Sequence, residues 1–179
     1  MFIFLWDLRA SIVGKAASTV TRFSASDCQL LSQLLERYGL VLKVLDPGKE
    51  IRGSFWGDEE AGLVGNSLVV RRDTPLHSVL HEACHYICMD KTRRGKLVTD
   101  AGGDYDEENA VCYLQLVLAD KIPGFGRDQM FSDMDAWGYT FRLGSARAWF
   151  EKDADDARSW LLSAGIISAS GEPTFILRS

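Results

Sequence analysis

The chain lacks any apolar run near the roughly 20 residues that a membrane-spanning helix needs. It also lacks a basic excess, because 20 Lys and Arg stand against 25 Asp and Glu, for a formal net charge of −5. Nucleic-acid backbones and anionic membranes attract basic surfaces. We therefore expect neither nucleic acid nor a membrane as the main partner.

The apolar segment at the start of the sequence does not read as a convincing signal peptide. Residues 1–6 are apolar, but no basic residue precedes them, and Asp7 and Arg9 end the run after a few positions. We interpret this segment as a core strand, with a docking segment for a partner as the alternative.

The four cysteines form no pattern typical of a secreted disulfide framework. Two of them, Cys84 and Cys88, lie one turn apart on a predicted helix, and the others are Cys28 and Cys112. Reduced, buried thiols in a cytoplasmic protein are the simplest interpretation.

A length of 179 residues predicts one domain, and 46% hydrophobic residues suffice for a core. No repeat, low-complexity tract or linker interrupts the chain. Strands are predicted first, and helices come later, which indicates an α+β domain. The predicted strands cover residues 40–45, 51–56, 66–71 and 174–178; the predicted helices cover residues 27–38, 75–88, 106–119, 128–140 and 146–163.

The helix predicted at 75–88 has a start signal and carries the motif that points to chemistry. Thr74 offers a capping hydroxyl, and Pro75 suits the first helical position. His81 and His85 then lie one turn apart on one face, so both imidazoles can reach a single metal ion. Glu82, between them, is placed as a general base toward a metal-bound water.

The apolar residues of this helix support that interpretation. At 100° per residue they form one contiguous arc, opposite the two motif histidines: Leu76, Val79, Leu80, Ala83 and Ile87. His77 is the remaining histidine of three, but it lies two turns from His85, about 12 Å along the axis, so one ion cannot bind both. Cys88 lies near the ligand face, a further turn from His81.

A catalytic zinc usually has three protein ligands, so a carboxylate is expected as the third. The helix predicted at 106–119 opens with several acids. Glu107 falls within the apolar arc of its wheel, and a buried carboxylate needs a cation. Glu107 is therefore our choice, while Glu108, which shares the polar side with Asn109 and Gln115, stays open, as do Asp104 and Asp106.

These motifs resemble those of the gluzincin metallopeptidases. His81, Glu82 and His85 match His-Glu-x-x-His, and residues 107–110 are similar to the Glu-x-x-Ala pattern around the third ligand in several gluzincin groups. The compact size is similar to the minimal zincin domains of the ImmA/IrrE-like bacterial regulatory peptidases. The resemblance covers roughly residues 66–119.

The resemblance implies a zinc-dependent metallopeptidase that hydrolyses peptide bonds of a peptide or protein substrate. His81, His85 and Glu107 would bind Zn²⁺, and Glu82 would be the general base. It implies one zincin-like domain, with a core over about 1–120 and a mainly helical extension over about 121–179. It also implies that residues 67–71 form a sheet edge able to pair with an extended peptide.

The chain departs from the gluzincin pattern at two positions. Cys84 replaces a small residue, and Val111 stands where some gluzincins have an aspartate that orients a histidine. Candidates for the transition-state donor are Tyr105, Tyr139 and Arg142. The alternative function is a catalytically silent zinc-binding regulatory or interaction module.

Residues 128–163 are rich in helically spaced aromatic residues, which are more typical of a core than of a binding site. The alternative is a helical cap over the cleft, with Gly124 and Gly126 as its joint.

Overall fold

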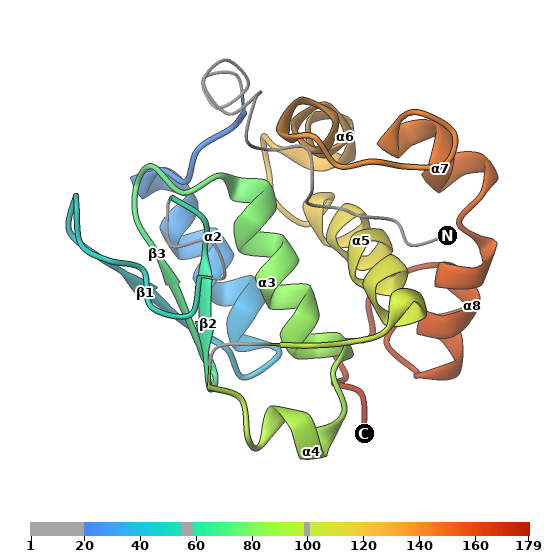
Figure 1. Ribbon diagram of the computed structural model, residues 1–179, viewed down its shortest axis with the longest axis horizontal. Coiled ribbons are helices and arrows are strands. Elements are labelled where there is room, and N and C mark those ends of the chain that lie inside the picture. Colours follow the sequence, from blue (N-terminus) through green and yellow to red (C-terminus); the bar gives the residue numbers. More distant parts are fainter. Residues whose placement is uncertain (1–19, 55–58, 99–100) are drawn as a thin grey trace.

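The computed structural model describes residues 20–54, 59–98 and 101–179, and it combines a small sheet with a larger helical part (Figure 1). The coarse α+β class is confirmed over these residues. The segment predicted as a strand at 1–6 lies outside them. No helix in the described ranges is long and apolar enough to cross a bilayer.

The described sheet has three strands, β1 (Val41–Val44), β2 (Gly62–Val64) and β3 (Ser67–Val70), in the order β1-β3-β2. β1 pairs in parallel with β3, and β2 pairs with β3 in antiparallel register. The strands predicted at 40–45 and 66–71 are confirmed as β1 and β3. The implied free edge at 67–71 is wrong, because β3 is the central strand and both of its sides are paired.

The strand predicted at 51–56 is not formed over residues 51–54, and residues 55–56 lie outside the description. Residues 52–53 instead make a turn that crosses closely over β2. Gly53 has a φ of +80°, and a Cβ there would lie 2.6 Å from the Leu63 carbonyl oxygen. Only glycine allows the backbone to come this close to β2. The chain therefore turns at residues 52–53, and the next strand is β2.

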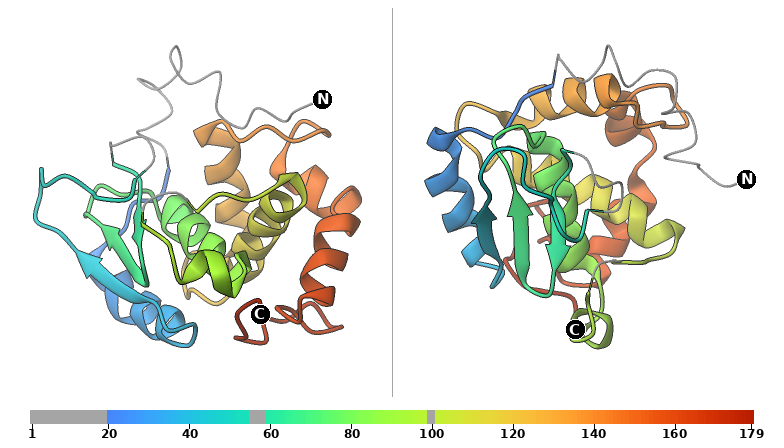
Figure 2. Two further views of the ribbon diagram at one scale, coloured as in Figure 1. Left: turned by 60° about the horizontal axis from the view of Figure 1, so that its bottom comes forward. Right: turned by 60° about the vertical axis from the view of Figure 1, so that its left-hand side comes forward.

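Helix α2 (Ala25–Glu36) packs on β1, and helix α3 (Leu76–Cys88) packs on β2 and β3. In the right-hand view of Figure 2 the sheet lies in front of α3, and α2 lies toward its left-hand edge. The predicted apolar arc of α3 is buried, which fixes the rotation of this helix: Leu76, Val79, Leu80, Ala83 and Ile87. The opposite side of α3, with its histidines, is turned toward the rest of the helical part.

The start of α3 differs from the predicted cap. Thr74 Oγ1 accepts a hydrogen bond from Arg71 N at 2.9 Å, and Pro75 occupies the N-cap position with no side-chain cap. The Leu76 N–H instead donates to the Thr21 carbonyl at 2.9 Å. The chain before α2 therefore satisfies a backbone donor that we expected Thr74 to satisfy.

Helix α5 (Tyr105–Ala119) is central to the helical part and packs against α3, α6 (Gly126–Trp137) and α8 (Asp155–Ser163). The helix predicted at 146–163 is broken, because α7 (Ala146–Lys152) ends before α8 begins. The strand predicted at 174–178 is absent, and the Arg178 N–H donates instead to the Ile87 carbonyl at 3.1 Å.

The segment between α3 and α5 contains one further short helix, α4 (Lys91–Arg94). The Asp90 carboxylate caps it by accepting hydrogen bonds from the N–H groups of Thr92 and Arg93. This turn carries Arg93 back toward the start of α5.

The aromatic residues after position 128 mainly pack into or against the core, as predicted. Phe131 and Trp149 are buried, and Phe150 stacks on Tyr113 of α5 with ring centroids 4.5 Å apart. They attach α6 and α7 to α5.

The burial of the thiols gives a first prediction. Burial raises the pKa of Cys84, Cys88 and Cys112 well above its usual value, whereas Cys28 is only half-buried. Ellman's reagent at neutral pH should therefore react rapidly with one thiol of the native protein, and with all four after denaturation. A second rapidly reacting thiol in the native protein would contradict this packing, and Cys28→Ser should remove the rapid phase.

Candidate metal centre

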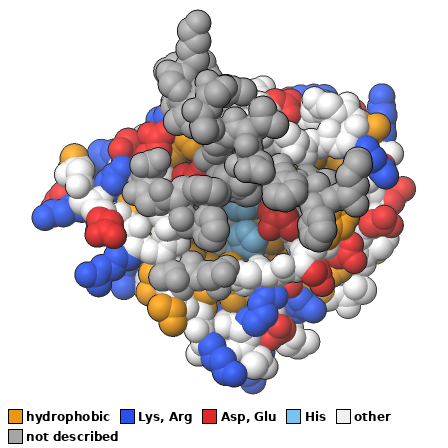
Figure 3. All heavy atoms as spheres, viewed as in Figure 1, with side chains coloured by type: hydrophobic (Ala, Val, Ile, Leu, Met, Phe, Trp, Pro, Cys, Tyr) orange, Lys and Arg blue, Asp and Glu red, His pale blue; other side chains and the backbone are white. Residues whose placement is uncertain are grey.

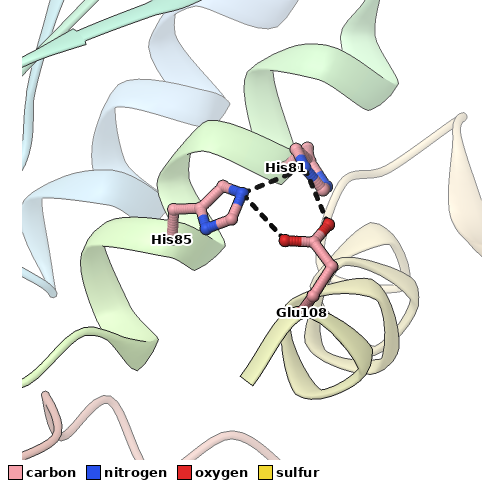
Figure 4. Close-up of side chains that lie close together, drawn as sticks. All are labelled: His81, His85 and Glu108. Carbon is pink, nitrogen blue, oxygen red and sulfur yellow. Dashed lines mark hydrogen bonds and ion pairs between the residues drawn. The ribbon is translucent and has the colours of Figure 1, made fainter. Parts of the chain in front are cut away.

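Two histidines on α3 and one glutamate on α5 converge where these helices pack together (Figure 4). The Nε2 atoms of His81 and His85 lie 3.1 Å apart. Each lies 3.4 Å from an oxygen of Glu108, Oε1 for His81 and Oε2 for His85. Within the described ranges, this is the one group of three or more potential ligands that could hold a metal ion.

These spacings fit a single zinc-sized ion. Nitrogen and oxygen ligands at about 2.0–2.2 Å from a tetrahedral ion are separated from each other by roughly 3.3–3.6 Å. The three observed separations, 3.1, 3.4 and 3.4 Å, are close to that range. The donor set, two imidazole nitrogens and one carboxylate, is also a common zinc set. The residues present therefore fit a metal ion without a change of backbone.

The site is largely shielded from water but reaches the surface. The side chains of His81 and His85 are 7% and 12% exposed, and that of Glu108 is 25% exposed. Figure 3 shows histidine atoms at the surface beside acidic side chains. Burial, followed by the nearby His81 and Arg93, lowers the pKa of His85 well below its usual value. His85 is therefore neutral at pH 7, the form that donates a lone pair to a metal.

The two histidines differ in the groups that contact their rings. His81 Nδ1 lies 2.7 Å from Oε1 of Gln115, a fully buried residue of α5. The His81 ring also meets the ring of Tyr139 edge-on, with centroids 5.8 Å apart. His85 Nδ1 is buried, and no group in the described part of the chain hydrogen-bonds to it.

Glu107, our predicted third ligand, points elsewhere. Its buried carboxylate accepts two hydrogen bonds from Arg93 and one from Arg178, each at 2.8 Å. The inference that a buried carboxylate needs a cation agrees with this arrangement, but the cations are two arginines. Glu108, one residue later and about 100° further round the helix, faces the histidines.

The remaining candidate ligands also have other roles. His77 is buried against Trp137 and Tyr139, with ring centroids 4.9 and 5.6 Å away. Asp104 caps α5 by accepting a hydrogen bond from the Glu107 N–H at 2.9 Å, and Asp106 is exposed. Cys88 is a buried thiol.

Among the candidates for a transition-state donor, Tyr139 lies beside the site, with its ring edge-on to that of His81. Tyr105 is 56% exposed. Arg142 is bound to Asp153, with Nε and Oδ2 2.7 Å apart. Glu82 lies on α3 beside His81 and is half-buried.

Sequence reasoning missed Gln115, Arg93 and Arg178 as parts of the site and its support. Helical periodicity could have indicated Gln115. This residue lies seven positions after Glu108, so the two side chains share one face of the helix. The arginines gave no such signal, since they come from α4 and from the segment after α8.

With this geometry established, we compared the chain with known proteins. No protein family, curated protein or solved structure matches it. The assignment of a function therefore depends on the site itself.

The two adjacent glutamates give a matched pair of variants. Glu108→Gln replaces a ligand carboxylate, so zinc affinity should fall at least about tenfold while the fold is retained. Glu107→Gln weakens the bonds to Arg93 and Arg178, so the free energy of unfolding should fall by about 1–3 kcal/mol. Zinc affinity should fall less than in Glu108→Gln, because the ligands are unchanged and the amide oxygen can still accept hydrogen bonds from the arginines.

Competition with a chromophoric chelator measures the zinc affinity, and urea denaturation of the metal-free protein measures the stability. If Glu107→Gln loses zinc and Glu108→Gln keeps it, the roles assigned to these two residues are reversed.

Proposed function

We propose that the protein is a zinc-dependent hydrolase of peptide bonds. One observation carries the proposal: His81, His85 and Glu108 bring three ligand atoms within 4.8 Å of one another, around the His-Glu-x-x-His motif of α3. A chance pairing of two surface histidines would not place a half-buried carboxylate from another helix 3.4 Å from each of them.

The donor set favours zinc over other biological cations. Mg²⁺ and Ca²⁺ prefer oxygen ligands, whereas two imidazoles with one carboxylate are typical of zinc. Structural zinc sites usually have four protein ligands, often cysteines. Three protein ligands would leave a position for water or substrate, which is the arrangement of catalytic sites.

When bound, zinc would act as a Lewis acid toward water and the scissile carbonyl. Glu82 would accept a proton from the attacking water while the water oxygen forms a bond to the carbonyl carbon. The same carboxyl group would then donate that proton to the leaving nitrogen as the C–N bond breaks. The place of Glu82 on α3, next to His81, supports this role.

The water-shielded setting of the site supports hydrolysis as well. Burial keeps His85 neutral at pH 7, and hydrogen bonds and charges act more strongly where water is excluded. The ring of Tyr139, edge-on to His81, makes its hydroxyl our preferred candidate for stabilising the developing oxyanion.

The test is Glu82→Gln, assayed with a mixed peptide library by mass spectrometry. The variant should bind zinc as the parent does but lose peptide cleavage at least about 100-fold, because the amide cannot accept the proton. Glu151→Gln is the matched control, since Glu151 is an exposed glutamate of α7 that should not affect cleavage.

Cleavage by Glu82→Gln at the parental rate would show that Glu82 is not the base. A parent protein that binds one zinc and cleaves none of the library would instead favour the silent zinc-binding module.

A further inference from the structure

We infer that Gln115 is a positioning residue for the metal: it fixes the tautomer and the ring orientation of His81, so that Nε2 presents its lone pair to the ion. The inference rests on the proposed metal site. It starts from one contact, the 2.7 Å separation of Gln115 Oε1 from His81 Nδ1, between two buried side chains.

The orientation of the Gln115 amide follows from its other neighbour. Gln115 Nε2 donates to the thioether sulfur of Met130, on α6, at a distance of 3.8 Å. A thioether can accept a hydrogen bond but cannot donate one, so the amide NH₂ group belongs on that side. The amide oxygen therefore faces His81 and can only accept.

An acceptor at His81 Nδ1 determines where the ring proton lies. Neutral imidazole carries one proton, and the short contact with Oε1 places it on Nδ1. Nε2 is then unprotonated. This is the atom that lies 3.1 Å from His85 Nε2 and 3.4 Å from Glu108 Oε1. His81 is thus prepared for metal binding before an ion arrives.

Gln115 and Glu108 lie on the same face of α5. They are seven residues apart, two helical turns, so the same face supplies a ligand and the partner of another ligand. Gln115 is fully buried, where a polar side chain is costly unless it is hydrogen-bonded. Its bond to His81 accounts for an amide in the core.

His85 differs from His81 at the Nδ1 position of the ring. No group in the described ranges bonds to His85 Nδ1, so that ring has no partner of this kind on the side away from the ligands. Loss of Gln115 would leave neither histidine with a hydrogen-bond partner at Nδ1. Partners of this kind typically affect metal affinity by about 10- to 100-fold.

A matched pair of variants tests the inference with Zn²⁺ alone. Gln115→Met keeps the length of the side chain but replaces the amide oxygen with a thioether sulfur, a much weaker acceptor, and zinc affinity measured by chelator competition should fall by about 10- to 100-fold. Gln115→Glu restores an acceptor, and its affinity should lie within about threefold of the parent or above it. Urea denaturation checks that the metal-free variants are folded.

The tautomer is measured independently on the unaltered, metal-free protein. Long-range ¹H–¹⁵N NMR correlations of the imidazoles, assigned through His77 and His85 variants, should show His81 protonated at Nδ1. His81 protonated at Nε2 would overturn the inference, as would equal zinc affinity for folded Gln115→Met and the parent. Failure of the parent to bind zinc would refute the metal site instead, while the tautomer of His81 would still be decided by NMR.

Discussion

The geometry of the site depends on the ion-pair cluster of Glu107, Arg93 and Arg178. Both arginines hold the Glu107 carboxylate at the start of α5, and the side-chain hydrogen bond with Glu107 raises the pKa of Arg93. Successive residues of a helix differ by about 100° in direction, so the position of Glu107 also sets the direction of Glu108. The backbone just before α5 leaves room for the Glu107 carboxylate. Gly103 has a φ of +134°, and a Cβ there would lie 3.0 Å from Glu107 Oε1.

Three separate segments meet in this cluster, which explains its structural role. Arg93 comes from the short helix that Asp90 caps, and Arg178 comes from the segment after α8. Arg178 also bonds to the end of α3 through its backbone N–H and through its side chain, which donates to the Cys88 carbonyl. The end of α3 and the start of α5 are thereby held together, and the ligands on the two helices keep their spacing.

Local sequence patterns were sufficient to predict the parts of the fold whose physics is local. The apolar arc of α3 and the spacing of His81 and His85 follow from helical periodicity, and both agree with the structure. The strands β1 and β3 are short, mostly apolar segments and were predicted as strands. The position of β3 within the sheet was not, because strand order depends on contacts between segments far apart in the chain.

The choice between Glu107 and Glu108 shows the same limit. A helical wheel identifies a carboxylate that turns inward, but it does not reveal which cation meets it. Similarly, some gluzincins have an aspartate that orients a histidine four residues after the third ligand, and counted from Glu107 that position is Val111. Counted from Glu108, the partner of His81 is Gln115, two turns along the helix. Counting from Glu107 therefore led away from both Glu108 and Gln115.

The central claim, that α3 and α5 together form a zinc site, is tested most directly by crystals of the tag-free protein soaked in zinc, with diffraction data collected on both sides of the zinc absorption edge. We expect one anomalous peak bound by Nε2 of His81, Nε2 of His85 and a Glu108 oxygen, each at about 2.0–2.2 Å. No peak between these residues, or a peak bound by Glu107 in place of Glu108, would contradict the account.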